Sequence, residues 1–176
     1  MATQLNTEIA IKRDAHFSGC GRYRYRLDRL WADSKPLLCF IMLNPSVADD
    51  TEDDPTVRKC IGFAERFGCG GFFVVNLYAY IATKPKDLKA AHWPTGGAMA
   101  DRVIERTLAI VAGHDAGLAI CAWGANARRM GRPSELLEMI KAAGLRPHAL
   151  NINADGTPAH PLMLPYSCGL VPYTSR

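Results

Sequence analysis

The chain has 176 residues, a mass of 19.3 kDa and a formal net charge of +4. Hydrophobic residues make up 48% of it and charged residues 22%, which is the balance of a globular protein and excludes a disordered or fibrous chain. The length predicts one domain over residues 1–176, and every apolar run falls far short of the roughly 20 residues that cross a bilayer.

The predicted elements begin with a β segment, followed by alternating strands and helices. Residues 22–29 alternate basic and apolar side chains, which is typical of a half-exposed strand. Residues 37–43 are apolar throughout, as expected of a central strand covered on both faces. An Asp-Pro pair then starts an amphipathic helix over 54–68, which ends at a glycine. A second buried strand follows at 72–77.

The second half of the chain continues this alternation. It predicts a helix at 98–112, a strand at 118–123, a helix at 134–143 and a last strand at 147–151, while residues from 153 onward are mainly loop. Glycine and proline lie at the joints between the elements. The pattern predicts an α/β sandwich with a mainly parallel central sheet, plus the N-terminal β segment.

The N-terminus and the cysteines indicate the compartment. The first residues lack a basic segment followed by an apolar stretch, so we expect no secretory signal, a cytoplasmic location and no membrane partner. No two cysteines stand at C-x-x-C spacing, and in a reducing compartment we expect free, mostly buried thiols. The six are Cys20, Cys39, Cys60, Cys69, Cys121 and Cys168. The glycines at 68–71 precede a strand, so they form no nucleotide-cofactor motif.

Polar residues stand where the predicted strands end. Loops at the carboxyl ends of parallel strands converge on one crevice, so such residues can meet at one site. Asn44 closes the first buried strand, Asn76 lies near the end of the second, Trp123 closes the third, and His160 stands in the final loop. An amide flanked by apolar residues needs partners, which favours Asn76 as the reader of a polar ligand. Ordinary alternatives are a turn residue for Asn44 and a backbone-bonded imidazole for His160.

Further polar and charged residues flank this predicted site. Pro45 and Ser46 follow the first buried strand. Arg128 and Arg129 follow the third strand, where they either bind phosphate or form a solvated basic turn. The acidic run at 49–54 suits a divalent cation, but its spacing does not match a calcium loop, and helix N-termini favour Asp and Glu. We therefore interpret the run as a solvated loop and a helix cap.

Five short segments, taken in order, resemble a family of bacterial and phage proteins catalogued as a domain of unknown function, the DUF1643 type. They are FIMLNPS at 40–46, DPTVRKC at 54–60, VVNL at 74–77, AWG at 122–124 and GTPAHPL at 156–162. The resemblance covers about residues 17–166. The same layout is similar, more distantly, to the uracil-DNA glycosylase superfamily, which implies a three-layer α/β/α sandwich.

The distant resemblance implies catalytic roles for Asn44 and His160 and a binding role for Asn76. Asn44 matches the residue that orients or activates the attacking water, Asn76 matches the amide that reads the base, and His160 matches the residue that stabilises the departing base. N-glycosidic cleavage has an oxocarbenium-like transition state, which a positioned water and hydrogen-bond donors stabilise. The other residues predicted to bind substrate are Pro45, Ser46, Trp123, Arg128 and Arg129.

The predicted function is hydrolysis of the N-glycosidic bond of a base in nucleic acid or in a nucleotide, without a metal or cofactor. Leu162 stands where that superfamily has a serine, which favours a modified base, single-stranded nucleic acid or a free nucleotide over duplex DNA. Two alternatives stay open. A non-catalytic nucleic-acid-binding or nucleotide-binding module would use Arg22, Arg24 and Arg26, and a metal-dependent phosphohydrolase would use the acidic run at 49–54.

Overall fold

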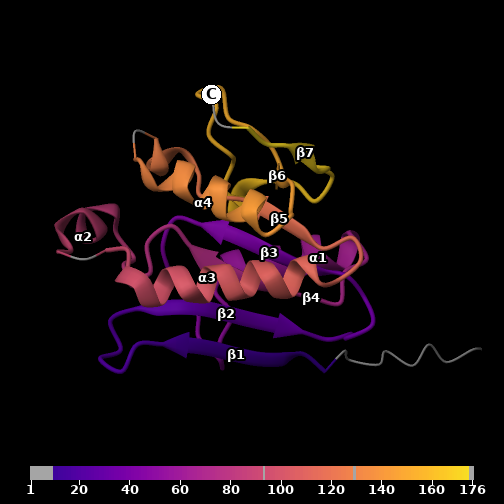
Figure 1. Ribbon diagram of the computed structural model, residues 1–176, viewed down its shortest axis with the longest axis horizontal. Coiled ribbons are helices and arrows are strands. Elements are labelled where there is room, and N and C mark those ends of the chain that lie inside the picture. Colours follow the sequence, from indigo (N-terminus) through magenta and orange to yellow (C-terminus); the bar gives the residue numbers. More distant parts are fainter. Residues whose placement is uncertain (1–9, 93, 129, 175–176) are drawn as a thin grey trace, which may run out of the picture.

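The computed structural model describes residues 10–92, 94–128 and 130–174 and has a mixed α/β fold with one seven-stranded sheet (Figure 1). The strands are β1 (Lys12–Phe17), β2 (Arg24–Leu30), β3 (Leu37–Met42), β4 (Gly71–Asn76), β5 (Leu118–Cys121), β6 (Pro147–Ala149) and β7 (Val171–Pro172). The helices are α1 (Pro55–Arg66), α2 (Pro85–Ala90), α3 (Gly97–Ala112) and α4 (Arg132–Ala142), with short 3₁₀ turns η1 (Ala125–Ala127) and η2 (Pro161–Met163).

The order of strands across the sheet is β1-β2-β4-β3-β5-β6-β7. The four strands β4, β3, β5 and β6 pair in parallel, as predicted for the centre, whereas the strands outside them pair antiparallel. Met42 at the end of β3 lies beside Asn76 at the end of β4, and Ile41 lies beside Cys121 at the end of β5. The chain therefore leaves these three strands at the same edge of the sheet.

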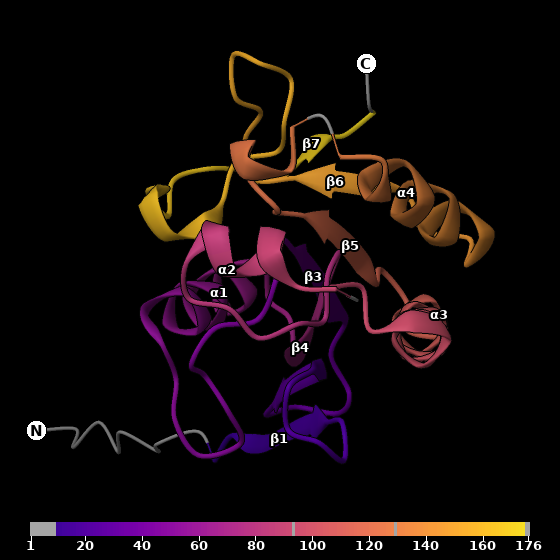
Figure 2. The ribbon, with the colours of Figure 1, turned by 90° about the vertical axis from the view of Figure 1, so that its left-hand side faces the viewer.

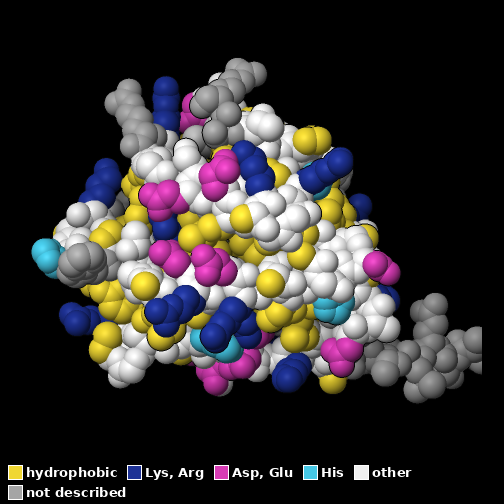
Figure 3. Space-filling model, viewed as in Figure 1, with side chains coloured by type: hydrophobic (Ala, Val, Ile, Leu, Met, Phe, Trp, Pro, Cys, Tyr) yellow, Lys and Arg dark blue, Asp and Glu magenta, His cyan; other side chains and the backbone are white. Residues whose placement is uncertain are grey.

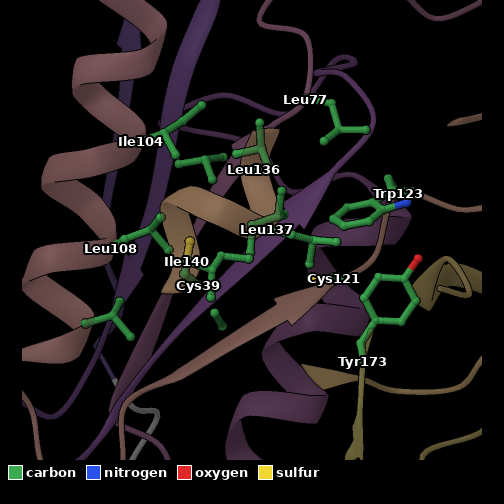
Figure 4. Close-up of a cluster of buried hydrophobic side chains, with 14 of the residues drawn as sticks. Cys39, Leu77, Ile104, Leu108, Cys121, Trp123, Leu136, Leu137, Ile140 and Tyr173 are labelled. Carbon is green, nitrogen blue, oxygen red and sulfur yellow. The ribbon is translucent and has the colours of Figure 1, made fainter. Parts of the chain in front are cut away.

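Helices cover both faces of the sheet, as Figure 2 shows with α1 and α3 on opposite sides of the strands. Successive strand residues point to opposite faces. Cys39 and Ile41 of β3 consequently pack in one cluster with residues of α3 and α4, while Leu38 and Phe40 pack in another with α1. Part of the first cluster is drawn in Figure 4. Burial on both sides explains why β3 is apolar throughout and why β4 carries no polar side chain before Asn76.

The long predicted elements match the structure closely. Residues 37–43, 54–68, 72–77, 98–112 and 134–143 correspond to β3, α1, β4, α3 and α4. Two short elements are not predicted. The helix α2 lies in a stretch expected to be loop, and β7 lies in the tail expected to be irregular. None of the helices in the described part of the chain is both long and apolar enough to span a bilayer.

The prediction of a half-exposed strand at 22–29 is wrong for most of β2. Arg24 is 4% exposed and Arg29 is fully buried. The segment 48–54 supplies acceptors for both guanidinium groups, because Arg24 Nη1 donates to the Ala48 carbonyl and Arg29 Nη2 donates to the Asp49 carbonyl. A buried charge is tolerated when such partners are present. Arg24 is therefore not part of an open basic face.

Candidate functional site

Two adjoining cavities lie where β3, β4 and β5 end. We call the smaller, of about 80 Å³, the inner cavity, and the larger, of about 310 Å³, the outer cavity. Both are lined by Met42, Asn44, Ser46 and His160. The inner cavity is also lined by Arg24, Asp54, Thr56, Val57, Val74 and Asn76, and the outer one by Leu43, Ala82, Thr83, Lys84, Trp123, Gly124, Ala125 and Asn126. The fold thus brings Asn44, Asn76 and His160 to one cavity.

Asn76, the last residue of β4, has a buried amide without a partner. Its side chain is 4% exposed, and neither Nδ2 nor Oδ1 makes a hydrogen bond to any described residue. The next residue, Leu77, donates its backbone N–H to the Met42 carbonyl at 2.8 Å, so hydrogen bonding to β3 continues past Asn76 and fixes its position. An unsatisfied buried polar group costs roughly 1–3 kcal/mol. A ligand that offers both a donor and an acceptor would recover that cost.

The amide of Asn44 has a defined orientation. Its Nδ2 donates to the Pro45 carbonyl at 2.9 Å and to the Ala82 carbonyl at 2.7 Å. Because two carbonyl oxygens surround one terminal atom of the amide, that atom must be the nitrogen. The oxygen Oδ1 is left as the acceptor that Asn44 offers to the cavities it lines. Asn44 therefore bonds within the turn through Nδ2 and, as a lining residue of both cavities, keeps Oδ1 as a free acceptor.

His160 lies between the two cavities as the N-cap of η2. Its Nδ1 accepts a hydrogen bond from the Leu162 backbone N–H at 3.3 Å. Burial lowers the pKa of His160 below its ordinary value, and the nearby charge of Asp54 opposes this effect. A neutral imidazole whose Nδ1 accepts carries its proton on Nε2. The side chain can thus act as a hydrogen-bond donor toward an oxygen or nitrogen of a ligand.

Trp123 and Gly124 form the wall that β5 contributes to the outer cavity. Trp123 is buried and packs edge-on against Tyr173, with ring centroids 5.6 Å apart (Figure 4). Gly124 has a positive φ of 73°, and a Cβ at this position would lie 3.4 Å from the Cβ of His160. The backbone conformation of this turn favours glycine, whereas a Cβ at this position would make only an ordinary contact with His160.

Arg24 and Asp54 line the inner cavity, although the sequence analysis does not place them at the site. Arg24 has an unpartnered Nε, and burial lowers its pKa to about 10 while the charge of Asp54 opposes that shift. Asp54 caps α1 through a hydrogen bond from the Val57 N–H to Oδ1 at 2.8 Å. The sequence shows Asp54 as a helix cap within the acidic run, but no local pattern indicates that the loop brings it to the cavity of Asn44, Asn76 and His160.

Two other carboxylates of the acidic run, those of Asp49 and Asp53, are bonded within the protein. Asp53 pairs with Arg29 at 2.7 Å and with Arg13 at 2.5 Å. Asp49 accepts hydrogen bonds from the backbone N–H groups of Glu52 and Thr51 and from the Thr51 hydroxyl, which together lower its pKa to about 2. The interpretation as a solvated loop and a helix cap is therefore confirmed for the exposed residues 50–52 and for Asp54, while Asp53 and the Asp49 carbonyl also fasten the loop to Arg29 of β2.

One group of side chains in the described part of the chain is close enough to share a metal ion, namely Asp14, His16 and Asp28. Arg26 already contacts two of them, through Asp28 at 2.7 Å and His16 at 3.2 Å. A guanidinium in contact with these ligands repels a cation. We therefore interpret the group as an ion-pair cluster of the β1–β2 hairpin.

Two predicted binding residues, Arg128 and Pro45, are absent from the described lining of the cavities. Arg128 is exposed at the end of η1 and is absent from the described lining of both cavities. Pro45 is buried, and its carbonyl accepts from Asn44 and from the Ala82 N–H, so it shapes the turn. Arg129 lies outside the described residues. On the face in Figure 3, Lys and Arg side chains are interspersed with Asp and Glu.

The fold and the site define a mixed α/β protein with a polar cavity at the carboxyl ends of parallel strands. Residues 24–162 match the family described as "Protein of unknown function (DUF1643)", and the chain belongs to that family. The matched segment runs from the first residue of β2 into η2 and includes all the residues that line the two cavities. Searches of curated proteins and of solved structures found no match.

Proposed function

We propose that this protein hydrolyses the N-glycosidic bond of a base in nucleic acid or in a nucleotide. The observation that carries the proposal is the buried amide of Asn76, whose two polar atoms have no partner among the described residues. One donor and one acceptor side by side match the edge of a nucleobase. Asn44 and His160 line the same inner cavity, which supports a reaction at the base rather than binding alone.

We also propose a three-layer α/β/α arrangement similar to the uracil-DNA glycosylase superfamily. Its support is the parallel order β4-β3-β5-β6 in the centre of the sheet, with α1 on one face and α3 and α4 on the other. The polar residues stand at the strand ends, where open parallel sheets bind ligands. The β1–β2 hairpin and β7 extend this core at its two edges.

In the proposed reaction, each residue has one task. Asn76 holds the base by a donor and an acceptor, and Asn44 Oδ1 accepts a hydrogen bond from the attacking water. His160 donates from Nε2 to the departing base, whose negative charge grows as the bond from the sugar breaks. Such prepositioned dipoles stabilise an oxocarbenium-like transition state without reorganisation. Ser46 and Trp123 line the outer cavity, where we place the sugar.

We propose a modified base, a single strand or a free nucleotide as the substrate, in preference to ordinary duplex DNA. The burial of Arg24 and the pairing of Arg26 with Asp28 leave β2 without the open basic face that a phosphate backbone requires. Asp50 and Glu52 are exposed on the acidic loop that follows Asn44, and they repel phosphate.

A base-release assay tests the proposal. The panel contains single-stranded and duplex oligonucleotides with uracil, hydroxymethyluracil or hypoxanthine, and the matching nucleoside monophosphates. We expect the wild type to release at least one base, and Asn44→Ala and Asn76→Ala to lower the rate by roughly 100-fold or more. Asn151→Ala changes an exposed asparagine and is the matched control.

The result decides between catalysis and binding. If the wild type releases no base from the whole panel, the hydrolase proposal is wrong. Salt-dependent binding without release would instead establish the non-catalytic module.

A further inference from the structure

The inner cavity has one carboxylate among its described lining residues, that of Asp54. As the N-cap of α1, Asp54 accepts the Val57 N–H on Oδ1. A carboxylate has about four lone-pair positions on its two oxygens, so the cap uses only part of its accepting capacity. Asp54 is thus available as an acceptor in the cavity that also contains Asn44, Asn76 and His160.

The proposed hydrolysis releases a proton for which these three residues provide no acceptor. Attack of water on the sugar carbon leaves a proton that a base must remove. The neutral amides of Asn44 and Asn76 hydrogen-bond to water but are far too weakly basic to take its proton. His160 Nδ1 is already bonded to the Leu162 N–H, and in the neutral ring Nε2 carries a proton. A carboxylate such as that of Asp54 can accept this proton.

The protein holds Asp54 in a fixed place. The preceding residue, Asp53, pairs with the fully buried Arg29 at 2.7 Å, and Arg24 bonds to the Ala48 carbonyl at the start of the same loop. The N-cap bond fixes the side chain of Asp54 itself. A group held by packing and by its neighbours needs little reorganisation when the reaction begins.

The charge of Asp54 acts on the other ionisable groups of the inner cavity. Asp54 lines the inner cavity together with Arg24 and His160, and its charge opposes the lowering, by burial, of the pKa of both. Arg24 provides a positive charge in the cavity and has an unpartnered Nε. The cavity therefore contains an acceptor, a counter-charge and a base-reading amide together.

We propose that Asp54 is the catalytic base of the N-glycosidic hydrolysis, an inference that rests on the proposed function. Its carboxylate takes a proton from the water that Asn44 orients. The water oxygen forms the new bond to the anomeric carbon, the bond between that carbon and the base nitrogen breaks, and its electron pair leaves with the base. His160 stabilises the departing anion, which then takes up a proton from solvent while Asp54 returns its proton to solvent.

The test compares Asp54→Asn with Asp50→Asn on the base that the wild type releases. Asparagine also caps helices well, so Asp54→Asn keeps α1 and loses only the basic carboxylate. We expect kcat to fall roughly 100-fold to 10,000-fold, as for loss of a general base, with KM within about threefold of the wild type. Asp50→Asn removes an exposed charge from the same loop and keeps the wild-type rate.

A second variant separates catalysis from folding. Asp54→Ser also preserves a cap but leaves space beside the water, so added formate should restore part of the rate in this variant and not in the wild type. Thermal melting of both variants checks that they are folded. Wild-type-like kcat in Asp54→Asn would overturn the inference and leave the proposed function intact, whereas a wild type that releases no base would remove both.

Discussion

The two buried arginines of β2 differ in how fully their guanidinium groups are bonded, although the loop at 48–54 supplies an acceptor to each. Arg29 bonds to Asp53 and to two backbone carbonyls, and its guanidinium fastens the loop at 48–54 to the sheet. Arg24 lies in the inner cavity with an unpartnered Nε, beside the equally unpartnered amide of Asn76. Folded proteins satisfy buried polar groups unless a ligand does so. The contrast separates a structural ion pair from the unpartnered polar groups that carry our proposed site.

The largest effect on stability is expected when the ion pair between Arg29 and Asp53 is broken. Asp53→Ala leaves Arg29 fully buried without its carboxylate, which should lower the free energy of unfolding by about 3–5 kcal/mol. Urea unfolding measures this loss. Asp50→Ala removes an exposed carboxylate from the same loop and should change stability by less than about 0.5 kcal/mol. Equal effects of the two variants would contradict a structural role for the Arg29 pair.

A smaller loss of stability is expected when Gly124, which lines the outer cavity together with His160, is replaced. Gly124→Ala places a side chain at a φ of 73° and against the His160 Cβ, which should cost about 1–2 kcal/mol and lower base release. Gly131→Ala is the matched control, because Gly131 has a φ of −73° and open space around its Cβ position. Thermal melting and the release rate of both variants test the prediction, which fails if they behave alike.

Unlike the two preceding variants, Asn76→Leu should not lower the stability of the protein. Leucine has a similar shape and removes two buried polar atoms that lack partners, so stability should stay unchanged or rise by about 1 kcal/mol while base release is lost. Asn153→Leu removes an amide that donates to Thr157 and should lower stability instead. Chemical unfolding of both variants checks the sign. A clear loss of stability in Asn76→Leu would mean that its amide has a structural partner.

The smallest expected effect is the pH dependence contributed by His160. Burial lowers its pKa in the folded protein below 6.5, so the unfolded chain binds the proton more readily. The stabilisation that the neutral His160 side chain contributes is therefore complete above pH 6.5. It is lost as the pH falls toward the pKa that His160 has in the folded protein. His160→Gln should abolish this part of the loss. Unfolding free energies measured at several pH values give the comparison, and identical slopes in the two proteins would refute it.

Local patterns predicted most of the fold for identifiable reasons. The uninterrupted apolar run of β3 predicted burial on both faces, and the Asp-Pro start and Gly68 set the ends of the first helix. Short elements such as α2 and β7 were not predicted, because six residues and two residues contain too few positions for a period to be recognised.

The candidate site was predicted in part. The positions of Asn44, Asn76 and His160, at strand ends and in a late loop, predict that they meet, and they do line one cavity. Arg24 was misplaced because an alternating basic pattern gives no sign of the loop that covers it. Arg128 was included because it follows β5, but the chain turns at η1 and leaves its side chain exposed.

Periodicity, caps and strand ends are properties of neighbouring residues, so local sequence specified the longer strands and helices and the polar residues that close them. The tertiary structure alone decided which polar groups are satisfied. Arg24 and its acceptor Ala48 are 24 residues apart, as are Arg29 and Asp53, and such partners meet only when the loop folds onto the sheet. The same folding carries Asp54 into the cavity and leaves Asn76 without a protein partner there.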